Sequence, residues 1–210
     1  MKKLFNYTDE AQNLIKSKIE TTGIKLGYKP VWGLLNELEE KVENVEIEKG
    51  SDEKSIVING AEYLVLTDEE ADKLAYEMVE NLIEDCGVRV FDLNLTHYLD
   101  ENFMDDLFGE CVAGHVADMT EEELEEKLNE YEADDEDDLI EKMIDQNEIE
   151  DYFDEDELID IAAKYGKFDY EEIIKDVLRF DSRGHVISVY DGEEIEIRWD
   201  DEWFYAYRMD

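Results

Sequence analysis

Acidic side chains so outnumber basic ones in this chain that any fold it adopts must leave most of its surface to carboxylates. The 210 residues include 62 Asp and Glu but only 20 Lys and Arg, a formal net charge of −42. Charge of this size opposes the compact state through self-repulsion. The chain is nevertheless 43% hydrophobic and holds 3 Trp, 12 Tyr and 8 Phe, which is enough to build a core. We therefore expect a folded protein and not a disordered one.

The negative charge is concentrated in the second half of the chain. Residues 1–60 carry a net charge of only −2, whereas residues 119–180 carry −20. Adaptation to high salt should acidify the whole surface, so the gradient argues against a halophilic protein. We expect an N-terminal α+β region over residues 1–118 and an acidic helical region with a C-terminal meander over residues 119–210, or one continuous domain that includes both.

Strand signals occur in two places. Runs rich in β-branched and aromatic residues predict short antiparallel meanders at about 45–66 and 185–208. The first contains Asn59-Gly60, a strong hairpin signal because both turn positions need positive φ. The second is expected to hold three strands, at 185–190, 193–199 and 203–208.

Helix signals fill the rest of the chain. The first 40 residues look helical, and Thr67 with Glu70 forms a capping box that opens a helix ending at Gly87. An extended piece is expected at 88–95, followed by a helix at 103–117. Several short, acidic amphipathic helices follow, the first capped by Thr120. The order of elements predicts an α+β fold.

Acidic tracts beside the apolar stripes are the main candidate for a functional surface. Carboxylates three or four residues apart on a helix lie about 5–6 Å from each other, so capped helices would present an array of fixed negative charge. Such crowding is expected to raise carboxylate pKa values. The alternative is that these acidic tracts are only solvent-exposed helix surface without a function. A small domain, however, needs a net charge of magnitude only about 2–8 to stay soluble. The expected partner-binding residues are Glu121, Glu122, Glu125, Glu126, Asp134, Asp135, Glu136, Asp137, Asp138, Asp154, Glu155, Asp156 and Glu157. Aromatic residues among these acids, Tyr131, Tyr152 and Phe153, are expected in the core, with a role as anchors as the alternative.

Signals for catalysis, metals and cofactors are weak. The sequence has no phosphate-cradling glycine loop, nucleophile elbow or HExxH motif, so we expect neither an enzyme nor a cofactor. The run from Asp134 to Leu139 lacks the glycine of a calcium loop, and Cys111 with His115 makes only half of a four-ligand metal site. Cys86 and Cys111 are expected to be buried thiols of a reducing compartment, and the chain cytoplasmic, in a host cell. The chain has no run of about 20 apolar residues, so we expect no membrane span. Direct nucleic-acid binding would need a cluster of basic residues, so we do not expect it either.

Two stretches carry a resemblance. Residues 63–72, containing Leu66-Thr67-Asp68-Glu69-Glu70-Ala71-Asp72, form the first, and the second joins residues 181–185, 190–193 and 204–208. They resemble small acidic proteins encoded by phages and prophages. The resemblance implies a viral origin but does not point to any particular activity or mechanism. In its composition, the chain is also similar to phage anti-CRISPR and antirestriction proteins that mimic nucleic acid.

These observations favour a non-enzymatic inhibitor whose acidic helices block the nucleic-acid groove of a basic host defence protein, a CRISPR effector or a restriction enzyme. One alternative is an acidic immunity or chaperone-like protein that neutralises a basic toxin or nucleic-acid-binding partner. The other is an enzyme with an unrecognised carboxylate site. The sequence does not specify an oligomeric state.

Overall fold

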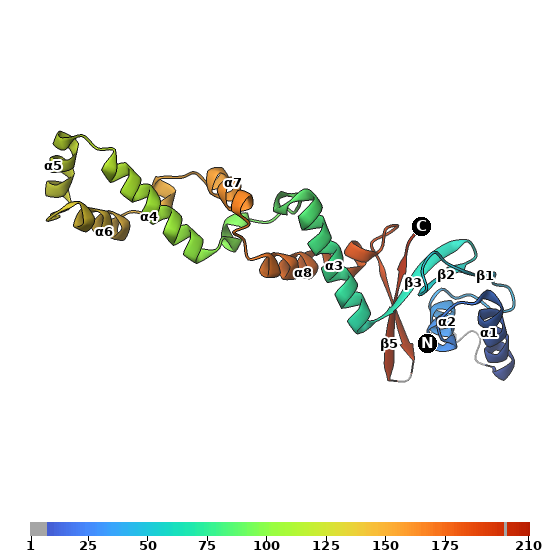
Figure 1. Ribbon diagram of the computed structural model, residues 1–210. Coiled ribbons are helices and arrows are strands. Elements are labelled where there is room, and N and C mark those ends of the chain that lie inside the picture. Colours follow the sequence, from blue (N-terminus) through green and yellow to red (C-terminus); the bar gives the residue numbers. More distant parts are fainter. Residues whose placement is uncertain (1–7, 200) are drawn as a thin grey trace. The chain divides into compact units, whose positions relative to one another are not determined.

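The computed structural model describes residues 8–199 and 201–210 and has an α+β fold (Figure 1). Its chain forms two compact units. We call residues 1–85 with 174–210 the sheet unit, and residues 86–173 the helical unit. The predicted boundary at 118/119 does not coincide with this division, because it falls inside the helical unit. The elements are α1 (Asp9–Thr22), α2 (Tyr28–Glu37), β1 (Ile47–Lys49), β2 (Ser55–Ile58), β3 (Ala61–Thr67), α3 (Asp68–Cys86), η1 (Val88–Val90), η2 (Leu95–Tyr98), α4 (Glu101–Ala117), α5 (Glu121–Glu130), α6 (Glu136–Gln146), η3 (Ile149–Asp151), α7 (Glu155–Tyr165), α8 (Tyr170–Ile187), β4 (Glu194–Trp199) and β5 (Glu202–Arg208).

One antiparallel sheet with the strand order β1-β2-β3-β5-β4 organises the sheet unit. The Asn59-Gly60 turn has φ values of 50° and 87° and joins β2 to β3, with Ile58 opposite Ala61, as predicted. The two expected meanders are not separate, because β3 pairs with β5 in a register that places Leu64 opposite Tyr207. This pairing brings together residues about 140 positions apart in the sequence.

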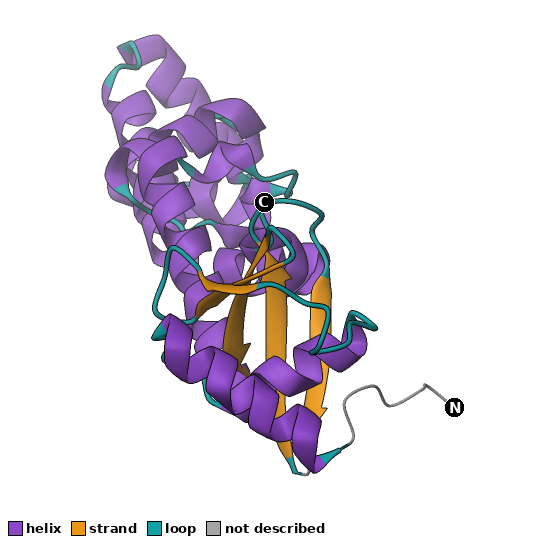
Figure 2. Ribbon diagram, turned by 90° about the vertical axis from the view of Figure 1, so that its right-hand side faces the viewer, coloured by secondary structure: helices purple, strands orange, loops and turns teal. Residues whose placement is uncertain are grey.

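Helices α1 and α2 cover one face of the sheet (Figure 2). Ile15, Val31, Leu34 and Leu35 are buried there against alternate strand residues, including Val65. Burial of apolar area contributes about 25 cal/mol per Å² to the stability of this layer.

Close packing on this face requires a glycine in the middle of α2. A Cβ at Gly33 would lie 2.2 Å from Cγ2 of Ile197, a separation that no van der Waals contact allows. The ring of Trp32 lies beside that of Trp199, with their centroids 4.6 Å apart.

The opposite face of the sheet packs against α3 and the end of α8. Leu64, Leu66 and Tyr207 point to this side, where they meet Ala71 and Ala75 of α3 together with Ile187. The strand residues alternate between the two cores because successive side chains of a strand point to opposite faces. Thr67 and Glu70 form the predicted capping box of α3, and Gly87, with φ 78°, follows its end.

The helical unit has a small core of its own, formed by α4, α5, α6 and η3. Phe108, Val112, Val116, Leu139 and Met143 are its buried residues. Half-buried residues close it, among them Leu124, Leu128, Tyr131 and Tyr152. The predicted helix at 103–117 is confirmed as α4.

Three local predictions are wrong. Residues 185–190 do not form a strand: α8 continues to Ile187 after a kink at Ser182 (φ 65°, ψ 159°), because Ile187 is buried against the sheet as part of a helix. The expected extended piece at 88–95 consists of two short 3₁₀ helices joined by a bend. Cys86 is exposed and Cys111 is half-buried, so neither is a fully buried thiol; the two do not form a disulfide.

Candidate functional site

All thirteen acids of the expected binding surface lie in the helical unit. This unit contains 32 acidic and five basic residues, so its 88 residues carry −27 of the net charge of −42. The 122 residues of the sheet unit carry the other −15. The charge gradient of the sequence is therefore a property of one compact unit.

These acidic tracts lie in or near the first turn of three helices, each with a capped N-terminus. Thr120 and Glu123 form the predicted capping box of α5, with a distance of 2.8 Å from the Thr120 amide nitrogen to Oε2 of Glu123. Asp135 caps α6 by accepting from the Asp138 amide, and Asp154 caps α7 by accepting from the Glu157 amide. Each helix then begins with three consecutive acids, which its N-terminal dipole stabilises.

Five of the expected binding residues have structural partners. Asp135, Asp154 and Glu157 take part in the caps. Asp138 forms an ion pair with Lys142 at 2.9 Å, and Asp156 forms one with Arg89 at 3.2 Å. These carboxylates are already engaged within the unit and are poor candidates for contact with a partner.

The other eight are exposed, and their side-chain carboxylates have no hydrogen-bond or ion-pair partner within residues 8–199 and 201–210. We call them the free acidic set: Glu121, Glu122, Glu125, Glu126, Asp134, Glu136, Asp137 and Glu155. Four of them lie on α5 at spacings of one, three and four residues, so they form one continuous patch on its outer side. Leu124 and Leu128 pack α5 against the core. Figure 1 shows α6 beside α4, and α5 beside α6, within this unit.

Intramolecular contacts already engage the cations of this unit. Arg89 pairs with Asp156 and Asp160, Lys127 with Glu130, and Lys142 with Asp138. The ammonium groups of Lys164 and Lys167 lie over the rings of Tyr165 and Phe103, at 5.1 and 5.6 Å from the centroids. The free acidic set is therefore not neutralised from within.

The charge density of α5 matches that of one nucleic-acid strand. Its ten residues hold six acids and one lysine, a net charge of −5. A helix of this length extends about 15 Å, and one DNA strand carries about four phosphates over the same distance. An array of this kind can attract Lys and Arg side chains that normally contact phosphate.

A second acidic area lies beside α7 and includes residues that the sequence analysis missed. A hollow of about 660 Å³ is lined by Glu101 and Asp105 of α4 and by Asp154 and Glu155. Phe153 also lines it, half-buried, with Met104, Ile149 and Leu158. The acids of α4 are 50 residues away from those of α7, so only the fold could bring them together.

Two of the three aromatic residues found among the acids, Tyr131 and Tyr152, belong to the core. Tyr131 and Tyr152 pack against it, and the ring centroid of Tyr152 lies 5.5 Å from that of Phe108. Phe153 is the aromatic residue among the three that lines an open hollow. It therefore has the better geometry for an anchor.

The expectation that crowding raises carboxylate pKa values is wrong for the groups that the structure perturbs. The pKa of Glu123 is lowered by hydrogen bonds from the amide and hydroxyl of Thr120. The pKa of Asp138 is lowered by the Asp134 amide and by Lys142. Local hydrogen bonds favour the charged form more than neighbouring acids oppose it.

Residues 63–72 and 181–208, which are distant in the sequence, meet at one cluster in the sheet unit. Arg183 donates to Asp68 and Asp72 of α3, each at 2.7 Å, and to both oxygens of Glu194 at 3.1 and 3.2 Å. Tyr207 also donates to Glu194, and the Arg183 guanidinium lies 4.4 Å from the ring centroid of Tyr205. The segments 67–72, 183–194 and 205–207 are thereby held together.

Burial and hydrogen bonding shift the pKa values in this Arg183 cluster. Although burial opposes the charged form of Arg183, the hydrogen bonds that it donates to Asp68 and Glu194 raise its pKa above the ordinary value. Burial and the bond to Glu194 raise the pKa of Tyr207. A Cβ at Gly184 would lie 2.5 Å from the carbonyl oxygen of Gly192, so that position needs glycine. The polar groups of the cluster bond to each other, so we interpret its role as structural.

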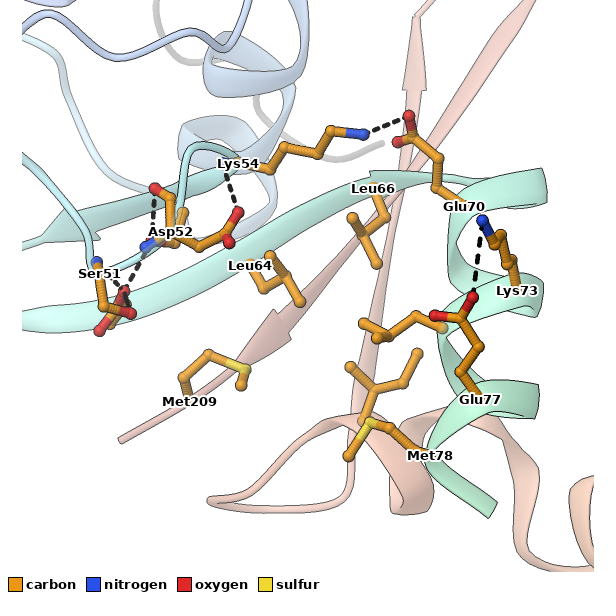
Figure 3. A pocket seen from close by; sticks show the side chains of 14 residues that line it. Ser51, Asp52, Lys54, Leu64, Leu66, Glu70, Lys73, Glu77, Met78 and Met209 are labelled. Carbon is orange, nitrogen blue, oxygen red and sulfur yellow. Dashed lines mark hydrogen bonds and ion pairs between the residues drawn. The ribbon is translucent and has the colours of Figure 1, made fainter. Parts of the chain in front are cut away.

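The sheet unit also has a pocket of about 630 Å³ between β2, β3 and α3 (Figure 3). Leu64, Leu66, Met78 and Met209 line its apolar part. Its polar groups satisfy each other: Lys54 pairs with Glu70, Lys73 pairs with Glu77, and Ser51 and Ser55 donate to Glu62.

Within the described residues, no three His, Cys, Asp or Glu side chains are grouped as metal ligands. No described helix is both long enough and apolar enough to span a bilayer. Comparison with protein-family models, curated proteins and solved structures found no match to this chain. A function must therefore be argued from the site itself.

Proposed function

We propose that this protein is a non-enzymatic inhibitor of phage origin that acts as a nucleic-acid mimic. Its helical unit would enter the nucleic-acid groove of a basic host defence protein, a CRISPR effector or a restriction enzyme. The observation that carries the proposal is the charge distribution: −27 of the charge lies on one 88-residue unit whose cations are already engaged. Solubility alone needs far less.

The free acidic set would replace phosphates against Lys and Arg of the target. Steering by such a field raises association rates, and the lifetime of the complex depends on contacts that exclude water. Phe153, in its acid-lined hollow, is the candidate for such a contact. Its ring can pack against the aliphatic stem of a Lys or Arg side chain, and the adjacent carboxylates can bind the charged end of that side chain.

A competition experiment tests the proposal. Purified protein is added to a guide-loaded CRISPR nuclease, to a restriction endonuclease and to a basic toxin nuclease, each with labelled substrate. A mimic excludes the nucleic acid from the first or second target, and its affinity falls with added salt without vanishing. A ternary complex with the nucleic acid fully engaged would contradict mimicry. Binding to the toxin alone would favour the immunity-type alternative.

Matched variants separate a defined surface from diffuse charge. Glu121, Glu122, Glu125 and Glu126 changed together to Gln remove four charges from α5 without breaking a cap or an ion pair. Glu20, Glu43, Glu46 and Glu48 changed to Gln remove four exposed charges from the sheet unit. We expect the first variant to lose at least ten-fold in inhibition and the second less than three-fold. Equal losses would argue for a diffuse effect.

A further inference from the structure

Strand β4 forms one edge of the sheet. It stands at the end of the strand order and pairs with β5 alone among the described strands. At six residues it is twice as long as β1, the strand at the other edge. An edge of this length presents a row of backbone groups that another extended chain can pair with.

A depression rich in aromatic and acidic groups adjoins this edge. It measures about 750 Å³ and is lined by Glu69, Glu196, Glu202, Trp203 and Tyr205, with Thr67, Asp68 and Phe204. Glu196 lies opposite Tyr205 in the strand register, and Arg198 lies opposite Trp203. The side chains next to the open edge therefore include carboxylates and ring faces.

The charges in the depression are not all matched. Asp68 pairs with Arg183, and Glu202 pairs with Lys29. Glu69 and Glu196 are exposed and have no ion-pair partner within the described residues. Trp203 is 43% exposed, and the Arg198 guanidinium of this chain lies 5.3 Å from its ring centroid. Unpaired carboxylates next to a half-exposed aromatic ring suit Lys or Arg.

Charge decides which strand could occupy the edge. A second copy of this chain would bring another net charge of −42 to the same place, which long-range repulsion disfavours. A strand with Lys or Arg at alternate positions would place its cations on one face, since alternate side chains of a strand share a face. Those cations would meet Glu69, Glu196 and Trp203.

We propose that the β4 edge and the adjoining depression bind an extended, basic segment of a partner protein as a sixth strand. Main-chain hydrogen bonds to β4 would supply affinity, and the depression would select the alternating cations. This surface lies on the sheet unit and does not depend on the acidic helices, so it is a second contact site independent of the proposed mimicry.

The test uses the full chain and a peptide of four Lys-Val repeats at 150 mM salt, followed by amide hydrogen exchange. We expect the peptide to slow exchange of amides in Glu194–Trp199, and a peptide of the same composition in two blocks, four Lys then four Val, to bind more weakly. Glu69→Lys with Glu196→Lys should weaken binding at least ten-fold. Trp203→Ala should weaken it two- to five-fold.

The matched control is Glu20→Lys with Glu43→Lys, an equal charge change on exposed acids of the same unit. It should weaken binding less than two-fold, and circular dichroism verifies that every variant is folded. The proposal is overturned if the peptide does not bind, if β4 amides are not protected, or if the block peptide or the control pair behaves like its counterpart. The α5 Gln variant should bind the peptide within two-fold of wild type, which separates this result from any failure of the proposed mimicry.

Discussion

Replacing Arg183 by Met should destabilise the sheet unit by about 2–3 kcal/mol. The Arg183 side chain is 19% exposed and its partner Glu194 is 22% exposed, while Asp68 and Asp72 are more than 60% exposed. Breaking a fully buried pair costs about 3–5 kcal/mol, and an exposed pair contributes only about 0–1 kcal/mol. The bidentate bond to Glu194 is close to a buried pair, whereas the bonds to Asp68 and Asp72 are exposed pairs. The expected cost of about 2–3 kcal/mol therefore lies between the two ranges. Met keeps most of the aliphatic part of the Arg183 side chain, so the loss of stability measures the contribution of the guanidinium group.

Urea unfolding followed by tryptophan fluorescence measures this effect selectively. Trp32, Trp199 and Trp203 all lie in the sheet unit, so the signal reports that unit. With an m-value of about 2 kcal/mol/M, the midpoint should fall by roughly 1–1.5 M. Lys25→Met is the control, because Lys25 and Glu53 are about two-thirds exposed, and it should cost less than about 1 kcal/mol.

A double variant tests the physical cause. If the cost arises from leaving the Glu194 carboxylate without its cation next to buried Tyr207, adding Glu194→Gln should recover part of it. The two changes together should then cost about 1–2 kcal/mol less than their sum. Strict additivity, or an Arg183→Met loss no larger than the Lys25→Met loss, would refute the argument.

Three further outcomes are expected. Hydrogen bonds from Ser55 and Ser51 lower the pKa of Glu62 below its ordinary 4.5, so the folded unit binds fewer protons than the unfolded chain. The stability advantage of wild type over Glu62→Gln should therefore be complete above pH 4.5 and shrink as pH falls further, as urea midpoints from pH 7 to 3 would show; a constant difference would contradict this. Added sodium chloride should raise the melting temperature of the helical unit by screening its charge of −27, measured by circular dichroism at 222 nm; a salt-independent melt would mean that its carboxylates do not repel each other appreciably. Gly33→Ala should cost about 1–3 kcal/mol through the clash with Ile197, whereas Gly114→Ala, whose Cβ meets nothing within 4 Å, should stabilise by about 0.5–1 kcal/mol; similar effects at both would exclude the steric explanation.

The elements that depend on neighbours in the sequence could be predicted from it. Caps such as Thr120 with Glu123 join residues three apart, and the Asn59-Gly60 turn needs only positive φ at two positions. Apolar periodicity was equally informative for α3, α6 and α7, since each of these helices buries a single stripe. The concentration of acids on one part of the chain was also visible in the sequence, because it is a matter of composition.

Pairings between distant residues were decided by the tertiary structure. The alternation at 185–190 resembles a strand, but burial of Ile187 against the sheet and the kink at Ser182 make this segment the end of a helix and a loop. The β3–β5 pairing, the closed cluster around Arg183 and the hollow shared by α4 and α7 all join residues that no local pattern connects. That Asp156 and Asp160 act as structural partners also depended on where Arg89 lies in the fold. A local pattern fixes a helix or a turn because its hydrogen bonds close within a few residues, whereas strand partners and ion pairs between distant residues are set by packing of the whole unit.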